Sequence, residues 1–205
     1  FFTRPAFVER LRGIHQSLID TDYDLVLYNV ETPERRDTYM RSVPRRERAD
    51  GVLIVSLPPR NEDLTSLENC PVPIVMIDAN HPSLTMLNRV IIDDVYGGRI
   101  ATEHLVKLGH RRIAYLSDTF ETPFNFTASF DRFRGYRQAL ERSGIEYRPE
   151  YQVAGEHSHR VARDLALSLL KLPERPTAIF AASDTQALGV LEAAQLLGLR
   201  VPRHR

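Results

Sequence analysis

Two features of the sequence predict an α/β fold with parallel sheets. Short apolar runs alternate with longer amphipathic segments along the whole chain of 205 residues, and this order is typical of parallel sheets covered by helices. Several apolar runs, among them 51–56 and 112–117, lack the alternation of a strand with one wet face, so both faces of these strands should be buried. We therefore expect two similar α/β halves, residues 1–92 and 93–205.

The first half opens with an amphipathic helix. Phe7, Leu11, Ile14 and Leu18 follow the i, i+4, i+7, i+11 spacing of one helical face, which predicts a helix from about Pro5 to residue 20. The remaining segments of this half predict strands at 24–30, 51–56 and 73–78 and helices at 33–42 and 61–68.

The stretch 90–116 is the most informative part of the chain, because it holds a complete strand, helix and strand. Its first, β-branched run is followed by Asp93 and Asp94, either of which can cap a helix by accepting hydrogen bonds from its first N–H groups. The helix should end at Gly109, since glycine readily takes the left-handed conformation of helix ends. The run 112–117 then predicts a second strand, and we interpret the whole stretch as a βαβ crossover.

The remainder of the second half repeats the same scheme. Gly144 and Gly198 stand where two further helices should end. No flexible linker separates the halves, and we place their boundary near residues 92–95. The expected elements are helices at 129–143, 158–172 and 184–197 and strands at 151–154 and 177–182.

Composition excludes several classes of protein. Lys and Arg number 27 and Asp and Glu number 27, so the chain has no overall positive charge with which to hold nucleic acid. A single cysteine, Cys70, excludes an internal disulfide framework and suits a reducing cytoplasm. No apolar stretch of about 18 residues and no signal-peptide pattern is present. We therefore expect a cytoplasmic chain that does not enter a membrane.

Four sets of short motifs occur in order along the chain. They are Pro5-Ala6-Phe7 to Gly13-Ile14; Asp93, Gly97, Ala101-Thr102-Glu103-His104-Leu105 and Leu108-Gly109-His110-Arg111-Arg112-Ile113; Arg132-Phe133-Arg134-Gly135-Tyr136; and Pro176-Thr177-Ala178-Ile179-Phe180 with Ser183-Asp184 and Ala187-Leu188-Gly189. This series resembles the effector-binding domain of a known family, the LacI/GalR (lactose-repressor type) transcription regulators, and the resemblance spans nearly the whole chain.

The resemblance implies a fold, a ligand and partners. The fold is that of type I periplasmic binding proteins, with two Rossmann-like subdomains and parallel sheets flanked by helices. A small effector, most often a sugar and in some members a nucleobase or nucleoside, binds between the subdomains and controls operator DNA binding by a homodimer. The DNA-binding headpiece, a first strand and a C-terminal acidic segment of that family are missing here, so we expect a fragment truncated at both ends.

Two other classes remain open. A solute receptor feeding a membrane transporter shares this fold, and a signal peptide upstream of Phe1 would distinguish it from a regulator, which carries a helix-turn-helix there. An enzyme would need a catalytic motif, and neither a Rossmann, a P-loop nor a nucleophile-elbow pattern occurs. Gly97 and Gly98 precede a helix but stand beside acidic residues, so we expect them to allow close helix-to-sheet packing rather than to bind phosphate.

Polar residues at the carboxyl ends of the predicted strands are the candidate ligand contacts, because ligands of open parallel sheets bind there. Small hydrogen-bonding side chains suit a polyhydroxylated ligand, whose hydroxyls need partners once water is removed. The alternative is that each simply caps the helix that follows. The candidates are Asn29, Ser56, Asp78, Ser117, Asp118, Ser183 and Asp184.

The resemblance assigns roles to some of these positions. It implies that Asp78 accepts hydrogen bonds from sugar hydroxyls and that Arg132 makes forked hydrogen bonds to the effector, although Arg132 can also be one of several surface arginines. Ser183 replaces an asparagine that is common in the family. For Asp184, capping of the last helix is the first interpretation, ahead of ligand contact.

Aromatic side chains are the other expected ligand contacts, because the C–H face of a sugar packs on rings. By the resemblance, Phe7, Phe126 and His157 stand where the family often places ligand-facing residues. The apolar loop 120–130 that contains Phe126 can equally be a packed lid or a dimer contact. His157 and His159 have no cysteine or carboxylate constellation beside them, so we expect neither a metal nor a cofactor.

Overall fold

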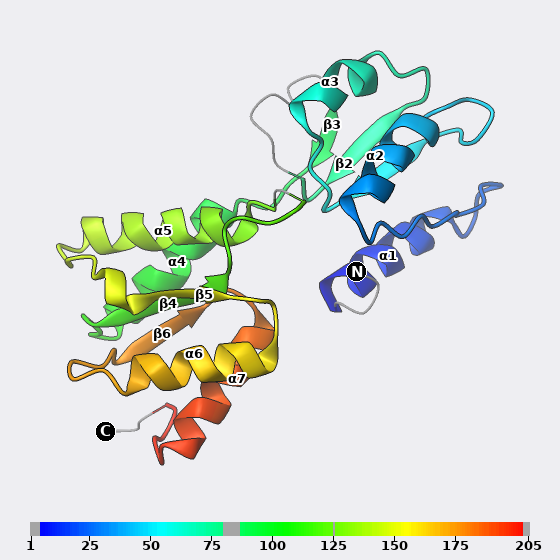
Figure 1. Ribbon diagram of the computed structural model, residues 1–205. Helices are drawn as coiled ribbons and strands as arrows, with labels where there is room; N and C mark the ends of the chain where they lie inside the picture. The colour runs from blue at the N-terminus through cyan, green and yellow to red at the C-terminus, as the bar shows by residue number, and fades with distance from the viewer. Residues whose placement is uncertain (1–4, 80–86, 125, 203–205) are drawn as a thin grey trace. The chain divides into compact units, whose positions relative to one another are not determined.

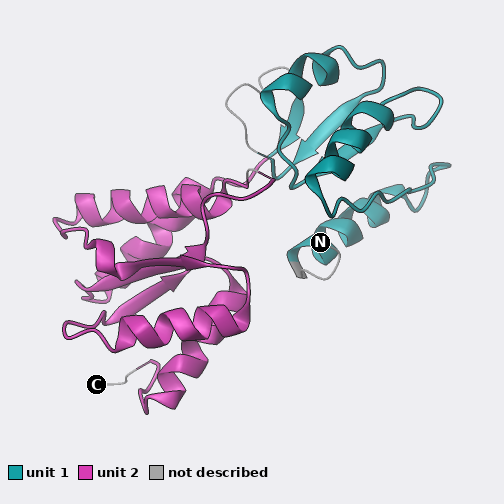
Figure 2. Ribbon diagram, in the orientation of Figure 1, with its two compact units in different colours: residues 1–90 teal, residues 91–205 magenta. Residues whose placement is uncertain are grey.

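The chain divides into two compact units, residues 1–90 and 91–205, coloured separately in Figure 2. The computed structural model describes residues 5–79, 87–124 and 126–202. Each unit has its own three-stranded parallel sheet flanked by helices (Figure 1), which confirms the predicted α/β class. None of the described helices is long and apolar enough to cross a membrane.

The first unit contains a sheet of strand order β1-β2-β3. Residue Ile77 of β2 pairs with Val55 of β1 on one side and Val90 of β3 on the other, so the carboxyl ends of the three strands lie at one edge. The elements of this unit are α1 (Pro5–Leu18), α2 (Pro33–Ser42), β1 (Val52–Val55), α3 (Asn61–Glu68), β2 (Ile74–Ile77) and β3 (Asn88–Val90).

Local sequence explains where α2 begins and how it packs. The Thr32 side chain caps the helix by accepting a hydrogen bond from the Arg35 N–H, and Pro33 occupies the first turn, where no N–H is needed. Arg36 and Met40, one turn apart, are both buried. The helices expected at 33–42 and 61–68 are confirmed.

Residues 24–30 were expected to form a strand, and this prediction is wrong. They pair with no strand among the described residues, and the side chains of Val26 and Leu27 are largely exposed. The Tyr28 ring instead packs on the Tyr39 ring of α2, with ring centroids 5.2 Å apart. A β-prone composition yields a strand only where a neighbouring strand accepts its backbone hydrogen bonds, and that neighbour cannot be read from a local pattern.

The second unit has the strand order β5-β4-β6. Helices α4 and α5 cover one face of this sheet, and α6 and α7 cover the other (Figure 1). Its elements are α4 (Asp94–Lys107), β4 (Ile113–Asp118), α5 (Ala128–Arg142), a short 3-10 helix (Pro149–Tyr151), β5 (Gln152–Gly155), α6 (His159–Leu170), β6 (Ala178–Ala181) and α7 (Asp184–Leu196).

The central strand β4 forms the middle of the core of this unit. Tyr115 packs with Tyr136 of α5 on one face, and Leu116 packs with Ala166 of α6 on the other. All four side chains have no exposed surface. The Tyr115 hydroxyl donates a hydrogen bond to the Ser129 carbonyl at 2.6 Å, so the one polar atom of this side chain is satisfied.

Helices α4 and α5 approach so closely that two positions require glycine. A Cβ atom on Gly98 would lie 2.1 Å from the Arg132 carbonyl oxygen, and one on Gly135 would lie 2.0 Å from the Val95 carbonyl oxygen. Gly97 has open space around its Cβ position. The expectation that both Gly97 and Gly98 allow helix-to-sheet packing is therefore wrong: only Gly98 is in close contact, and its neighbour is a helix.

The stretch 90–116 is not a βαβ crossover within one sheet. Its first strand, β3, ends at Val90 and pairs with β2 of the first unit, whereas β4 belongs to the sheet of the second unit. Ile91 and Ile92, which were expected to continue the strand, lie outside it and are exposed. A strand–helix–strand pattern indicates the order of elements, but strand pairing is decided by contacts that are distant in the sequence.

Candidate functional site

Two polar residues follow neighbouring strands at the carboxyl edge of the sheet of the first unit. Ser56 follows β1 and Asp78 follows β2, and both have left-handed backbones with φ of 50° and 52°. Their N–H groups donate to the carbonyls of Ile77 and Val90 at 2.7 and 2.8 Å. A left-handed serine or aspartate costs free energy, and such strain is concentrated at functional sites.

Arg10 of α1 joins this pair. Its guanidinium donates to the Asp78 carboxylate at 2.5 Å and to the Ser56 hydroxyl at 3.1 Å, and that hydroxyl also lies 3.1 Å from the same carboxylate oxygen. Phe7, a predicted contact, lies one turn before Arg10 and is half-buried. Arg10 was not among the predicted contacts, although its i, i+3 spacing from Phe7 indicated a shared helical face.

Asn29, another predicted contact, does not follow a strand. Its amide nitrogen donates to the Glu31 carboxylate at 2.7 Å. Its Oδ1 atom is buried and has no hydrogen-bond partner within the described part of the chain. The structure therefore does not bring Asn29 together with Ser56 and Asp78 through any described hydrogen bond.

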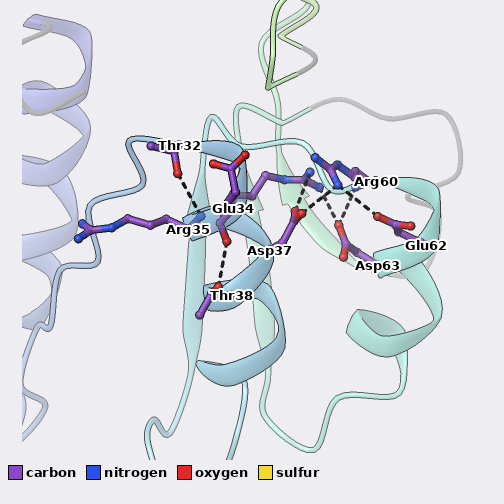
Figure 3. A network of polar contacts seen from close by, with 9 residues as sticks. Thr32, Glu34, Arg35, Asp37, Thr38, Arg60, Glu62 and Asp63 are labelled. Carbon is purple, nitrogen blue, oxygen red and sulfur yellow. Dashed lines mark hydrogen bonds and ion pairs between the residues drawn. The ribbon is translucent and has the colours of Figure 1, made fainter.

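An ion-pair network joins α2 to the loop and helix that follow Ser56 (Figure 3). Arg36, only 1% exposed, contacts Asp63 at 2.7 Å and Asp37 at 3.4 Å. The Arg60 guanidinium contacts Asp37 at 2.9 Å, and the Arg60 backbone N–H donates to the Asp63 carboxylate. Burial lowers the pKa of the Arg36 guanidinium, and Asp63 opposes that shift. The arginines of this network pair with its aspartates. The network therefore holds α2 to the loop that follows Ser56 and leaves these charges neutralised by one another.

In the second unit, Asp118 is the last residue of β4 and the centre of a hydrogen-bonded chain. The Nδ1 atom of His157, a predicted contact beyond the end of β5, lies 2.9 Å from Asp118 Oδ1 and 3.0 Å from Oδ2. The Gln186 amide donates to Oδ1 at 2.7 Å. Gln186 lies in the first turn of α7 and is 1% exposed. Gln186 was not among the predicted contacts, because nothing in the local sequence predicts that its side chain reaches β4.

Ser183 extends this chain and caps α7. Its hydroxyl accepts a hydrogen bond from the Gln186 N–H at 3.3 Å and lies 3.1 Å from Gln186 Oε1. Asp184 was expected to cap the helix, and this is wrong: Ser183 has the extended backbone of the cap, and Asp184 is the first helical residue, with its side chain exposed. Asp184 therefore stands beside the chain without a described hydrogen bond to it.

Arg132 lies in the first turns of α5, as expected for a residue that points to the strand ends. Its Nε donates to Asp94 at 2.8 Å and its Nη1 donates to the Ala182 carbonyl at 2.5 Å. Asp94 is the first residue of α4, whose cap is Asp93. Arg132 is thus held between the start of α4 and the end of β6, next to Ser183. Its side chain remains 31% exposed.

Phe126 lies in the loop before α5 and is half-buried. Its ring stacks on that of Phe124, with centroids 5.5 Å apart, and its N–H donates to the Thr122 hydroxyl at 2.9 Å. No described contact links Phe126 to the Asp118 chain. The neighbouring Phe120 turns inward and packs on Phe133 of α5 at 5.2 Å, so part of this loop belongs to the core.

Both units therefore present polar side chains at the carboxyl edge of a parallel sheet, which is where such sheets bind ligands. Ser56, Asp78 and Ser183 follow strands and Asp118 ends one, so all four lie at the strand ends where they were predicted. Within residues 5–79, 87–124 and 126–202, no group of three His, Cys, Asp or Glu side chains is arranged to hold a metal ion.

Comparisons with known proteins agree with this architecture. The family described as periplasmic binding proteins and sugar binding domain of the LacI family matches residues 2–204. Catabolite control protein A of Priestia megaterium is 31% identical over 196 residues, which are 96% of this chain and 58% of that protein. The ribose operon repressor of Escherichia coli K12 is 31% identical over 202 residues, 98% of this chain and 60% of that protein.

Solved structures show the same fold. A LacI-family regulatory protein from Chloroflexus aggregans superposes with a TM-score of 0.81 and 29% identity, over 94% of this chain and 68% of that one. This chain spans about three-fifths of the length of the curated relatives it matches.

Proposed function

The chain belongs to the family of periplasmic binding proteins and LacI-type sugar-binding domains, and from this premise we propose that it is the ligand-sensing part of a LacI-type transcription regulator. The relatives are regulators of gene expression by name, among them a ribose operon repressor and the transcriptional repressor CytR. The observation that carries the proposal is the set of polar side chains at the strand ends of both units.

These side chains suit a small polyhydroxylated effector. The Arg10, Ser56 and Asp78 group offers a cation, a hydroxyl and a carboxylate within hydrogen-bond distance of one another. The Asp118 chain offers a carboxylate, an imidazole and a hydroxyl. A ligand with several hydroxyls requires both donors and acceptors when it leaves water.

For the intact protein, we place the DNA-binding headpiece outside this chain and the protein in the cytoplasm, where operator DNA is. Two headpieces that read a palindromic operator require two-fold symmetry, so the intact protein is a homodimer. The effector changes DNA affinity only if it binds two conformations with different affinity. The protein is not an enzyme in this proposal.

A solute receptor that serves a membrane transporter is the second candidate, because the family includes periplasmic binding proteins. The regulator names of the relatives favour the first candidate. The sequence upstream of Phe1 in the complete protein separates the two, since a signal peptide there supports a receptor and a helix-turn-helix supports a regulator.

Thermal unfolding of the complete protein against a panel of monosaccharides, disaccharides and nucleosides tests the proposal. A ligand at 100 times its dissociation constant stabilises the folded state by about 2.7 kcal/mol, so an effector raises the unfolding midpoint measurably. The same compound should then change operator affinity in a DNA-binding titration. Absence of any effect on DNA binding by a compound that binds tightly would contradict the regulatory proposal.

Arg132→Ala should weaken effector binding by about 1.5–3 kcal/mol, the scale of a charged hydrogen bond. It should also lower the stability of the unliganded protein, because Arg132 bonds Asp94 and the Ala182 carbonyl in the absence of ligand. Arg134→Ala, on the same helix and more exposed, is the matched control and should leave effector affinity unchanged. Calorimetric titration of the effector into each variant measures its affinity. Equal affinities for the two variants would remove Arg132 from the site.

A further inference from the structure

The hydrogen bonds around Asp118 have determined directions, because each donor and acceptor has only one consistent assignment. An ionised carboxylate can only accept, so the Gln186 amide nitrogen donates to it. That orientation turns Gln186 Oε1 toward Ser183, whose hydroxyl must then donate its single proton to Oε1. The hydroxyl also accepts from the Gln186 N–H. Ser183 therefore has no proton left for a ligand and can only accept a hydrogen bond from one.

The Asp118 carboxylate also requires a proton on the nitrogen of His157 that faces it. Its Nδ1 atom lies 2.9 and 3.0 Å from the two oxygens of the Asp118 carboxylate, so Nδ1 carries the proton. In a neutral imidazole the other nitrogen, Nε2, is then an acceptor. The His157 side chain is 24% exposed, so part of the ring surface is accessible.

Charged side chains near the strand ends of the second unit are more often negative than positive. The positive charge of Arg132 is matched by Asp94 at 2.8 Å, whereas the hydrogen-bond donors to Asp118 are an amide and an imidazole. Asp184 adds a second carboxylate at the start of α7. The strand ends of this unit therefore carry excess negative charge, and a second anion brought to them would be repelled.

Resting on the proposed function, we infer that the effector is an uncharged molecule rich in hydroxyl donors, and that the Asp118–His157–Gln186–Ser183 chain excludes phosphorylated forms of it. In this inference Asp118 and the remaining acceptor atoms of His157 and Ser183 each receive a hydrogen bond from such a ligand. A phosphate group offers mainly acceptors and a negative charge, so it leaves these groups unpaired. Gln186 is a positioning residue, since its amide sets the direction of both bonds that it joins.

Matched pairs of compounds test the exclusion. Calorimetric titration of the complete protein compares ribose with ribose 5-phosphate, glucose with glucose 6-phosphate, and adenosine with its 5′-monophosphate. In any pair in which a compound binds, the uncharged compound should bind at least about tenfold more tightly than its phosphate ester. Equal or tighter binding of a phosphate ester overturns the inference and leaves the proposed sensor function in place.

Asp118→Asn tests whether the Asp118 carboxylate causes the preference for uncharged compounds. The substitution keeps the shape of the side chain, removes its charge and replaces one acceptor by a donor, so the preference for the uncharged compound should fall about tenfold. Asp164→Asn is the control. Asp164 is an exposed carboxylate on α6 that pairs with Arg163, so this variant changes net charge equally and should leave the preference unchanged. The same loss of preference in both variants would assign it to overall charge and overturn the inference.

The tautomer can be measured without any ligand. Long-range proton–nitrogen NMR spectra at about pH 9, where ordinary imidazoles are neutral, distinguish the protonated ring nitrogen from the other, and His157→Gln identifies the signals of His157. The inference requires a protonated Nδ1. A protonated Nε2 overturns it, whether or not any compound binds. If no compound of any pair binds but Nδ1 is protonated, the hydrogen-bond directions stand and the proposed sugar-sensing function loses its support.

Discussion

At the scale of single residues, the buried tyrosines make the stability of the second unit sensitive to alkali. Burial raises the pKa of Tyr115 and Tyr136 far above the usual range. Above about pH 10 these tyrosines ionise in the unfolded chain but stay protonated in the folded one. The folded state then binds more protons than the unfolded state, so the free energy of unfolding falls as the pH rises.

Tyr136→Phe should make this decline shallower, by up to about 1.4 kcal/mol per pH unit. Near neutral pH the same variant should lose about 1 kcal/mol, because the Tyr136 hydroxyl donates to the Ile113 carbonyl at 2.8 Å. Urea unfolding between about pH 8 and pH 11 measures both effects. Tyr23→Phe, at an exposed position, should follow the wild-type curve. Parallel curves for Tyr136→Phe and the wild type would show that Tyr136 does not cause the decline.

The candidate site was predictable only where a local pattern places a residue. Asp78, Asp118 and Ser183 follow short apolar runs, and such positions reach the carboxyl edge of a parallel sheet whatever the rest of the fold does. Arg10 and Gln186 hydrogen-bond to carboxylates 68 residues away in each case. No periodicity encodes a contact over that separation, because it depends on how helices pack on the sheet.

At the scale of secondary structure, the close approach of α4 and α5 should be intolerant of a single methyl group. Gly98→Ala would place a Cβ atom 2.1 Å from the Arg132 carbonyl oxygen, and the helices must separate to accept it. Overpacking of this kind typically costs about 1–3 kcal/mol, and occasionally more. Because Arg132 lies at that contact, effector affinity should fall as well. Chemical unfolding and calorimetric titration measure the two effects.

The adjacent glycine provides the control for this prediction. Gly97 has no atom within 4 Å of its Cβ position, so Gly97→Ala should stabilise α4 by up to about 1 kcal/mol through helix propensity alone. If the free energy of unfolding falls in Gly98→Ala and rises in Gly97→Ala, the loss comes from helix packing and the gain from helix propensity. Equal effects would mean that α4 and α5 do not make this contact in solution.

Helices were easier to predict than sheet membership. The helix at 33–42 has its cap, its first-turn proline and its buried face within one short segment, so its bounds follow from local chemistry. The segment 24–30 has a β-prone composition, yet it does not pair with the described strands. The strand that ends at Val90 was placed with β4, whereas it pairs with β2, since strand partners are chosen by tertiary contacts.

At the scale of the whole molecule, the two units differ in how completely they bury their strands. Five consecutive residues of β4 in the second unit are buried, from Ile113 to Ser117. In the first unit, all three residues of β3 are exposed, and so are Val26 and Leu27. Regions with less burial open at lower free energy, so we expect the first unit to exchange its amide hydrogens faster in the unliganded protein.

Paired core substitutions test whether the units unfold separately. Met76→Ala in β2 and Leu116→Ala in β4 each remove a side chain with no exposed surface, and each should cost about 2–5 kcal/mol. Hydrogen exchange measured by mass spectrometry should show faster exchange of β1 and β2 in Met76→Ala with β4 unchanged, and the reverse in Leu116→Ala, because substitutions that share no packing partners do not couple. Faster exchange of both sheets in either variant would show instead that the two units unfold as one cooperative structure. In that case a ligand bound to either unit would stabilise both, so midpoint shifts alone would not tell which strand ends it contacts.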